Sequence, residues 1–400
     1  LGNDFYGSPL GLRWSPNGSR LPVFLLGGAW SRYAGKHFGE IIWSRRATGL
    51  DKDQRYYDND AWKTDGNVFT KAEWQIGRSC TLFGDLQYRR VAYQFLGFNN
   101  RLENVAQKVH FSFFNPKVGI NWSPRPRLEL YAFAGQAARE PNRDDFTQST
   151  PQSRPRVEFL YDAEAGVRTR GSRWSASANL YRMQYRDQLV PDGRINDVGA
   201  YIRTNVPDSY RMGLEVEATM SPNPRWTFSA NVALSRNKIP HFTEYRDNWA
   251  TGTQELIAYR QTDLAFSPRA TGRAEAGYVF LKNKRHTVQA YLSGKYVGRQ
   301  FLDNTSNTAT ALNPFFFSDL RFQYDVSRWV GQNLRLIASI NNVFNAHYAS
   351  NGWTYRFVSP DYDPRPDDPF VRRESGDVYH QAGFFPQAGR HWMLSVVAEW

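Results

Sequence analysis

Residues 221–237 read SPNPRWTFSANVALSRN, a polar turn followed by a stretch in which apolar and polar side chains alternate. One face carries Trp226, Phe228, Ala230, Val232 and Leu234, and the other carries Thr227, Ser229, Asn231, Ser235 and Asn237. A period of two residues indicates a β-strand whose faces meet different surroundings. Proline and asparagine before the strand favour a tight turn. The stretch therefore predicts a strand that begins at a turn and opens with tryptophan.

The same alternation recurs along the chain. Near Leu180 the pattern changes phase, because the aromatic residues move to Tyr181 and Tyr185, and either a β-bulge or a band of aromatic residues would explain the change. Taken together, the stretches predict an antiparallel all-β chain of about fifteen strands. The expected strands are 5–15, 21–32, 67–76, 81–95, 111–122, 128–138, 157–169, 174–186, 202–220, 226–237, 262–280, 287–299, 316–326, 334–345 and 391–400.

The connections between these strands alternate in length. Short polar turns are expected at 15–20, 123–127, 170–173, 221–224, 282–285 and 327–332. Long connections are expected at 33–65, 96–108, 139–156, 187–205, 238–261, 300–314 and 346–387. Long structureless loops are uncommon in compact soluble domains, whereas short turns at one rim and long loops at the other are typical of outer-membrane barrels. The pattern predicts a transmembrane β-barrel.

Tryptophans mark the rim with the short turns. Trp14, Trp122, Trp174 and Trp226 each lie beside a short turn, and Trp400 ends the chain. Each of these tryptophans falls on the same face of its expected strand as the neighbouring apolar residues. Because indole combines an apolar ring with one N–H donor, it favours the boundary between membrane and water. We expect these five residues to form the membrane girdle at the periplasmic rim.

Composition excludes several classes of protein. The chain has 400 residues, 16% aromatic residues and a mean hydropathy of −0.63. It has no apolar run long enough for a spanning helix, and it is too aromatic for a disordered chain. The net charge of +12 comes from arginines spread along the sequence, so we expect no nucleic-acid partner; solvated faces or anionic lipid account for the charge. Cys80 is the single cysteine, which excludes an intrachain disulfide.

The sequence carries no catalytic or cofactor-binding motif of a common type. We expect neither an enzyme nor a cofactor. Asp51, Asp53, Asp58 and Asp60 could supply oxygen ligands to a hard cation, but they lack the spacing of a calcium loop, and a solvated acidic loop explains them better. Aromatic residues in the long connections could stack on a ligand or pack within the loops. They are Tyr56, Tyr57, Trp62, Tyr245, Trp249, Trp353 and Tyr355.

Five motifs resemble one family in their order along the chain. They are residues 139–146 (REPNRDDF), 185–190 (YRDQLV), 209–215 (SYRMGLE), 341–348 (NNVFNAHY) and 389–394 (GRHWML), with an aromatic residue at the end. Together they resemble the barrel of TonB-dependent outer-membrane receptors over nearly the whole chain. The terminal Trp400 departs from the phenylalanine that is commoner in the family, but it keeps the aromatic ring.

The resemblance implies a barrel of about 22 strands with a plug domain in its lumen. Residues 1–400 are then expected to be the C-terminal portion of the barrel, with about 15 strands of a likely 22, and the N-terminal plug and first strands are expected to be missing. An odd number of strands agrees, because it cannot close with antiparallel pairing throughout. In this register Arg321, Gln323 and Asp325 face the lumen, where they are expected to hold the plug.

The family implies active uptake across the outer membrane. A scarce ligand binds the outer loops, and TonB acts on the plug to open a path. Expected partners are the TonB complex, outer-membrane lipid and lipopolysaccharide, and a small ligand such as an iron chelate; a corrin-like cofactor and an oligosaccharide stay open. Arg139 and Arg143 are the preferred ligand contacts, although pairing with Glu140, Asp144 and Asp145 would make them structural. The alternatives are a passive porin or oligosaccharide channel, an outer-membrane hydrolase and a soluble carbohydrate-binding protein.

Overall fold

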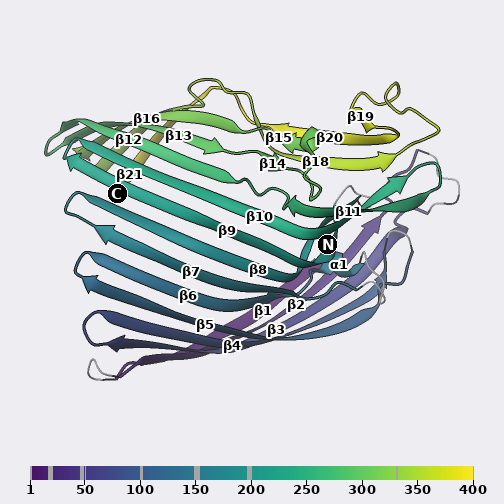
Figure 1. Ribbon diagram of the computed structural model, residues 1–400, viewed down its shortest axis with the longest axis horizontal. Helices are drawn as coiled ribbons and strands as arrows, with labels where there is room; N and C mark the ends of the chain where they lie inside the picture. Colours follow the sequence, from purple (N-terminus) through teal and green to yellow (C-terminus); the bar gives the residue numbers. More distant parts are fainter. Residues whose placement is uncertain are drawn as a thin grey trace.

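One large antiparallel sheet, which bends round as a curved wall, makes up most of the computed structural model (Figure 1). The structure describes residues 2–16, 21–45, 49, 51–99, 102–147, 154–195, 201–329 and 332–399. The first ten strands are β1 (Gly2–Trp14), β2 (Val23–Glu40), β3 (Arg55–Ile76), β4 (Cys80–Phe98), β5 (Gln107–Arg125), β6 (Leu128–Arg139), β7 (Glu158–Arg170), β8 (Trp174–Ile195), β9 (Tyr201–Asn223) and β10 (Trp226–Asn248). Their order in the sheet follows their order in the chain.

Beyond β10 the chain completes the wall and adds hairpins to it. The remaining strands are β11 (Thr253–Asp263), β12 (Ala270–Lys282), β13 (His286–Val297), β14 (Gln300–Phe301), β15 (Ala311–Leu312), β16 (Phe315–Trp329), β17 (Gln332–Asn341), β18 (Ala349–Val358), β19 (Val371–Ser375), β20 (Val378–Pro386) and β21 (His391–Glu399). Two short helices, α1 (Arg143–Thr147) and η1 (Thr308–Thr310), lie in connections. No helix in the described ranges is long and apolar enough to span a membrane.

Strand β10 divides the wall from the hairpins. Its first half pairs with β12, with Ala230 opposite Ala274, and its second half pairs with β11. The wall continues through β13, β16, β17 and β21. Within the described residues the wall therefore contains fifteen strands, β1–β10, β12, β13, β16, β17 and β21, which confirms the strand order predicted from the alternation. Among these residues β1 pairs only with β2 and β21 only with β17, so both are edge strands.

The two faces of the wall differ in chemistry. On β10, Ala230 stands between Ala218 and Ala274, whereas Asn231 stands between Glu217 and Arg273. The face with Asn231 also carries α1 on β3–β5, since Phe146 packs against Tyr93, Phe95 and Phe111 there. We call this the inner face. The opposite, outer face exposes large apolar side chains such as Leu180, Val232 and Leu234. A soluble protein rarely exposes apolar surface on this scale.

The strands are longer than the alternation predicted at the rim with the long connections. Residues 33–65 were expected to form a connection, but most of them extend β2 and β3, with His37 opposite Asn59. The same holds for 187–205 and 238–261, and 346–387 contains β18, β19 and β20. Outside a membrane both faces of a strand meet water or other loops, so the period-two signal fades although the backbone pairing continues.

The change of phase near Leu180 does not disturb the backbone. Pairing of β8 with β7 and β9 runs without a shift through Tyr181 and Tyr185, so the β-bulge, one of the two explanations of the phase change, is absent from this part of the described chain. Tyr181 instead lies on the inner face over Gly213, where a Cβ atom would come within 2.7 Å of the tyrosine hydroxyl. The glycine is thus needed to accommodate the ring.

Candidate ligand-binding site

Four charged side chains form a compact cluster on the inner face where β3, β4 and the end of β6 meet. Arg89 binds Asp65 through Nε and Nη2, at 2.9 and 2.5 Å, and binds Glu140 through Nη1 and Nη2, at 2.8 and 2.9 Å. Lys63 Nζ lies 2.7 Å from Glu140 and 3.7 Å from Asp65. The two cations and two carboxylates compensate one another, so this cluster fixes the wall and the start of the 140–147 segment.

The segment after Glu140 places Arg143 on α1. Asn142 and Asp145 cap each other, since each backbone N–H donates to the side chain of the other, at 2.8 and 3.0 Å. Arg203 from β9 binds Asp145 with two hydrogen bonds of 2.9 Å. Asp145 is therefore held from two directions, which explains how so short a helix is positioned against the wall.

Arg139 and Arg143 occupy different environments. The Arg139 side chain is 59% exposed and lies 3.2 Å from Glu158 of β7. Arg143 is 26% exposed, and it contacts the Asp144 carboxylate at 3.1 Å and the side-chain oxygen of Asn59. The buried Arg143 Nε has no hydrogen-bond partner. Arg139 thus keeps a more accessible guanidinium, and Arg143 has one donor left over.

A second charged network joins the outer hairpins. Glu244 of β10, which is 2% exposed, accepts hydrogen bonds from Arg246 at 2.8 Å and from Arg356 of β18 at 2.7 and 2.9 Å. Arg356 also binds Glu374 of β19 through Nε at 3.0 Å and Nη2 at 2.5 Å. We call Glu244, Arg246, Arg356 and Glu374 the hairpin network. It ties β18–β20 to the β10–β11 hairpin.

Electrostatics in the hairpin network favour the charged forms of Glu374 and Arg356. Burial alone would raise the pKa of Glu374, but hydrogen bonds with His380 and Arg356 outweigh that effect and hold the pKa at about 2. Burial of Arg356 acts to lower its pKa, but the two carboxylates raise the pKa above its ordinary value. Glu374 and Arg356 therefore stay charged at neutral pH.

Three predicted aromatic candidates lie beside this network. Trp249 stacks on Phe357 with ring centroids 3.9 Å apart, and its Nε1 donates to the Tyr355 hydroxyl at 3.3 Å. That hydroxyl donates to Asp247 at 2.7 Å, and burial raises the pKa of Tyr355 to about 12. Tyr245 lies under the Arg194 guanidinium at 4.6 Å. The half-exposed face of Trp249 is available to a ligand, while Tyr355 is committed to internal contacts.

The other aromatic candidates are scattered. Tyr56 and Tyr57 pack edge to face, with centroids 5.1 Å apart, at the start of β3. Trp353 lies on β18 against Gly383. Trp62 shares the outer face with Val68 and lies between Ala34 and Gln94, so it points away from the lumen. The structure thus brings Trp249 and Tyr355 together and separates Trp62 from the inner side chains.

The aspartates do not assemble into a metal site within the described chain. No group of three or more potential ligands comes together there, and Asp58 instead binds Arg55 at 2.7 Å. Asp60 lies opposite Lys36. Asp51 and Asp53 precede β3 in the connecting segment. The expected loop therefore holds only for the exposed Asp51 and Asp53, because Asp58 and Asp60 are partly buried on β3, where the backbone pairing of β2 and β3 continues.

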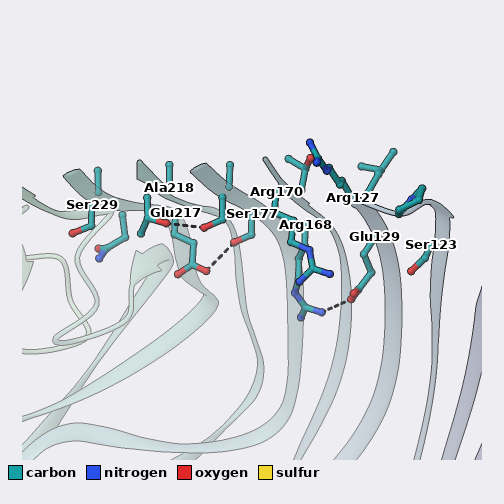
Figure 2. A pocket seen from close by; sticks show the side chains of 17 residues that line it. Ser123, Arg127, Glu129, Arg168, Arg170, Ser177, Glu217, Ala218 and Ser229 are labelled. Carbon is teal, nitrogen blue, oxygen red and sulfur yellow. Dashed lines mark hydrogen bonds and ion pairs between the residues drawn. The ribbon is translucent and has the colours of Figure 1, made fainter. Parts of the chain in front are cut away.

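A polar hollow of about 440 Å³ lies on the wall near the short-turn rim. Figure 2 shows Glu129, Arg168, Ser177 and Glu217 projecting into it from β6, β7, β8 and β9. Arg168 binds Glu129 at 2.6 Å, and Ser177 donates to Glu217 at 3.1 Å. Beyond a polar position in the alternation, nothing in the sequence distinguishes these residues. Arg321, Gln323 and Asp325 have inner-face positions on β16 as well, and Gln323 donates to Asp325 at 2.8 Å.

Tryptophans lie along the same rim. Trp14, Trp122, Trp174 and Trp226 stand at strand ends beside the short turns, and their side chains are half exposed. Trp226 lies opposite Tyr278, and Trp174 lies opposite Met220, both on the outer face. Trp400 lies outside the described residues.

Residues 2–343 match the family model described as TonB dependent receptor-like, beta-barrel. No curated protein sequence matches the chain. Among solved structures, the ferric yersiniabactin uptake receptor FyuA from Yersinia pestis is similar with a TM-score of 0.63 and 13% identity, over 100% of this chain and 55% of that one.

Two other solved structures are similar to a greater extent. The copper transporter OprC has a TM-score of 0.71 and 17% identity, over 98% of this chain and 56% of its own. The siderophore receptor PiuA from Acinetobacter baumannii has a TM-score of 0.71 and 14% identity, over 99% of this chain and 56% of its own. The chain thus spans about half the length of the structures it resembles.

Proposed function

The chain belongs to the TonB-dependent receptor β-barrel family, and from that premise we propose that it forms the C-terminal portion of a receptor that imports a scarce ligand with energy supplied by TonB. The family is one of outer-membrane transport receptors rather than enzymes. The observation that carries the proposal is the pairing of an apolar, exposed outer face with a polar inner face along fifteen strands.

We infer that further strands and a plug domain complete this wall. The edge strands β1 and β21 each have one partner in the described chain, and an unpaired edge cannot remain inside a bilayer because its backbone groups would lose their hydrogen bonds. The polar hollow with Glu129, Arg168 and Glu217 suits a plug, since it offers charged groups of both signs. TonB would act through that plug.

The ligand is proposed to enter at the rim that carries the hairpins. Trp249 offers a half-exposed ring on the rigid hairpin network, and Arg139 offers an accessible guanidinium at the end of β6. A stacking surface together with a planar cation suits a flat anionic molecule such as a ferric chelate. FyuA is a ferric yersiniabactin uptake receptor and PiuA is a siderophore receptor, which supports this class.

We propose that the outer face of the wall contacts the membrane. Trp14, Trp122, Trp174, Trp226 and Trp400 would form the periplasmic girdle, and the outer face would contact outer-membrane lipid and lipopolysaccharide. Because the described residues hold a wall with two unpaired edges, a passive porin formed by this chain alone is less favourable.

Uptake measurements test the proposal. Cells that lack other iron receptors would express the full-length receptor and be supplied with radiolabelled ferric chelates of different charge. We expect saturable uptake of at least one anionic chelate and weaker uptake after Trp249→Ala. Trp43→Ala, which changes an exposed tryptophan after β2, is the matched control. Failure to take up any chelate at normal surface expression would reject iron-chelate import.

A further inference from the structure

A group of cations lies on the outer face of β2, β4 and β5, on the side away from the lumen. Arg32 lies opposite Thr64, Thr64 lies opposite Ala92, and Ala92 lies opposite His110. Residues in register across a sheet share one face. Arg90 stands one residue pair closer to the short-turn rim, opposite Gly66 and Ser112, and Lys108 stands one pair further from it, opposite Gln94. We call Arg32, Arg90 and Lys108 the outer cation group.

Arg32 and Lys108 line a groove of about 550 Å³, and Arg90 lies one residue pair below it. It is lined by Arg32, Trp62, Thr64, Ala92, Gln94, Lys108 and His110, together with Tyr93. Strands are roughly 4.8 Å apart and alternate residues along a strand roughly 6.7 Å apart, so the Cα atoms of Arg32 and Arg90 are about 12 Å apart. Two long, flexible side chains can converge on one anionic group across that distance.

The outer cation group lies where the apolar surface ends. Trp30 stands level with Arg90, and Tyr88 and Phe114 stand one residue pair below it towards the short turns; all three rings are half exposed on the same face. Below these come Leu26, Leu86 and Val118. Tryptophan and tyrosine mark the level at which hydrocarbon gives way to headgroups. The cations therefore stand at headgroup depth on the side with the long connections, which faces the outside of the cell in this class of barrel.

The cations are uncompensated, in contrast to those on the inner face. Lys63 and Arg89 are neutralised by Asp65 and Glu140, as described above. In the ranges that the structure describes, Arg32, Arg90 and Lys108 make no ion pair and are exposed. The nearby carboxylates are Asp4 and Asp60, at the upper edge of the face, and Asp60 lies opposite Lys36.

We propose that the groove lined by Arg32 and Lys108, with Arg90 just below it, binds the phosphorylated headgroup of an outer-leaflet glycolipid. One arginine guanidinium can donate two parallel hydrogen bonds to two oxygens of a phosphate, and lysine adds a point charge. The negative charges of Asp4 and Asp60 would repel the phosphate from the upper edge of this face. Trp62 and Thr64 would contact the sugar, while the acyl chains would lie along the apolar face below. The inference rests on the outer-membrane location of the family and not on the transported ligand.

Lipid titration of the full-length receptor in neutral detergent, followed by native mass spectrometry, tests this site. The groove variant combines Arg32→Gln, Arg90→Gln and Lys108→Gln. The control variant combines Arg78→Gln, Arg225→Gln and Arg285→Gln, three exposed arginines in short turns at the opposite rim. Heat-modified migration on gels would verify that each variant forms a barrel. The probes are diphosphoryl lipid A, lipid A without phosphates, and inorganic phosphate.

We expect wild type and control to bind diphosphoryl lipid A equally, and the groove variant to bind at least about tenfold more weakly. Lipid A without phosphates should bind wild type as weakly as it binds the groove variant. Equal binding by the groove variant, equal loss in the control, or no preference for the phosphorylated lipid would overturn the proposal. Displacement of the lipid by an equal concentration of inorganic phosphate would assign the groove to a free anion instead. This experiment measures lipid binding and not chelate uptake, so its result does not depend on whether the proposed function is correct.

Discussion

Arg356 of β18 and Glu374 of β19 form a two-point ion pair, with Nη2 and Nε lying 2.5 and 3.0 Å from the two carboxylate oxygens. The same guanidinium reaches Glu244 on β10 through its remaining nitrogen. One side chain thus connects two hairpins through Arg356 and Glu244, which are 112 residues apart in the chain. The hairpins at the outer rim are consequently held as one unit, which gives Trp249 a fixed position on it.

Removal of the central carboxylate should loosen this unit. Glu244→Gln leaves Arg246 and Arg356 buried with one charge fewer to compensate them, and breaking a buried ion pair costs about 3–5 kcal/mol. We expect faster amide hydrogen exchange in β18 and β20 with little change in the wall strands. Asp363→Asn is the control, because Asp363 pairs with Arg365 at an exposed site. Unchanged exchange in β18, or an equal effect of the control, would contradict the role assigned to Glu244.

Acid should loosen the hairpins only well below neutrality. Glu374 has a pKa of about 2 in the folded protein and an ordinary value of 4.5, so its stabilising contribution is present in full above about pH 4.5 and is lost as the pH falls towards 2. A nitroxide label placed by Phe370→Cys in a Cys80→Ser background would report mobility by electron paramagnetic resonance. We expect constant spectra between pH 7 and 5 and greater mobility between pH 4 and 2. Glu374→Gln should abolish that acid transition, and a transition centred near pH 6 would show that another group controls the hairpins.

The outer and inner faces should respond differently to added charge. Ala230→Arg places a cation among Ala218 and Ala274, where an arginine at the bilayer midplane costs about 2–4 kcal/mol. Asn231→Arg places it beside Glu217 on the polar face. In the full-length receptor, folding yield in lipid vesicles should fall much further for the first variant. Equal yields would contradict the assignment of the two faces.

Replacement of the two candidate arginines should weaken binding of an anionic ligand. Arg139→Ala with Arg143→Ala removes an accessible guanidinium and one with an unused donor. We expect affinity for an anionic ferric chelate to fall by about tenfold or more, with surface expression preserved. Arg156→Ala is the control, since Arg156 is similarly exposed and pairs with Asp187 at 2.6 Å. Normal affinity in the double variant would reject the ligand role, and lost expression would show that the pair is structural.

The wall could be predicted because a membrane imposes one strict pattern on it. Trp226–Leu234 alternates since one face meets lipid and the other meets polar groups, and each of the fifteen wall strands carries part of that signal. The strand ends and hairpins at the rim with the long connections carry no such signal. His37 and Asn59 face each other across β2 and β3, although neither belongs to an alternating stretch.

The site could be predicted only in part, because its contacts depend on register. Aromatic residues in long connections pointed to Trp249 and Tyr355, which do lie together. Trp62 was predicted for the same reason, but its position in the alternation of β3 places its side chain on the outer face. Arg32, Arg90 and Lys108 share that face only once four strands are aligned, and nothing in their separate sequence contexts brings them together.

The energy dependence of uptake tests the central claim most directly. Cells expressing the full-length receptor would be given a labelled ferric chelate with TonB present, with TonB deleted, and with the proton gradient collapsed. The account predicts saturable accumulation only when TonB and the gradient are both present, with surface binding retained in all three cases. Uptake at the same rate without TonB, rising linearly with chelate concentration, would identify a passive channel and contradict the account.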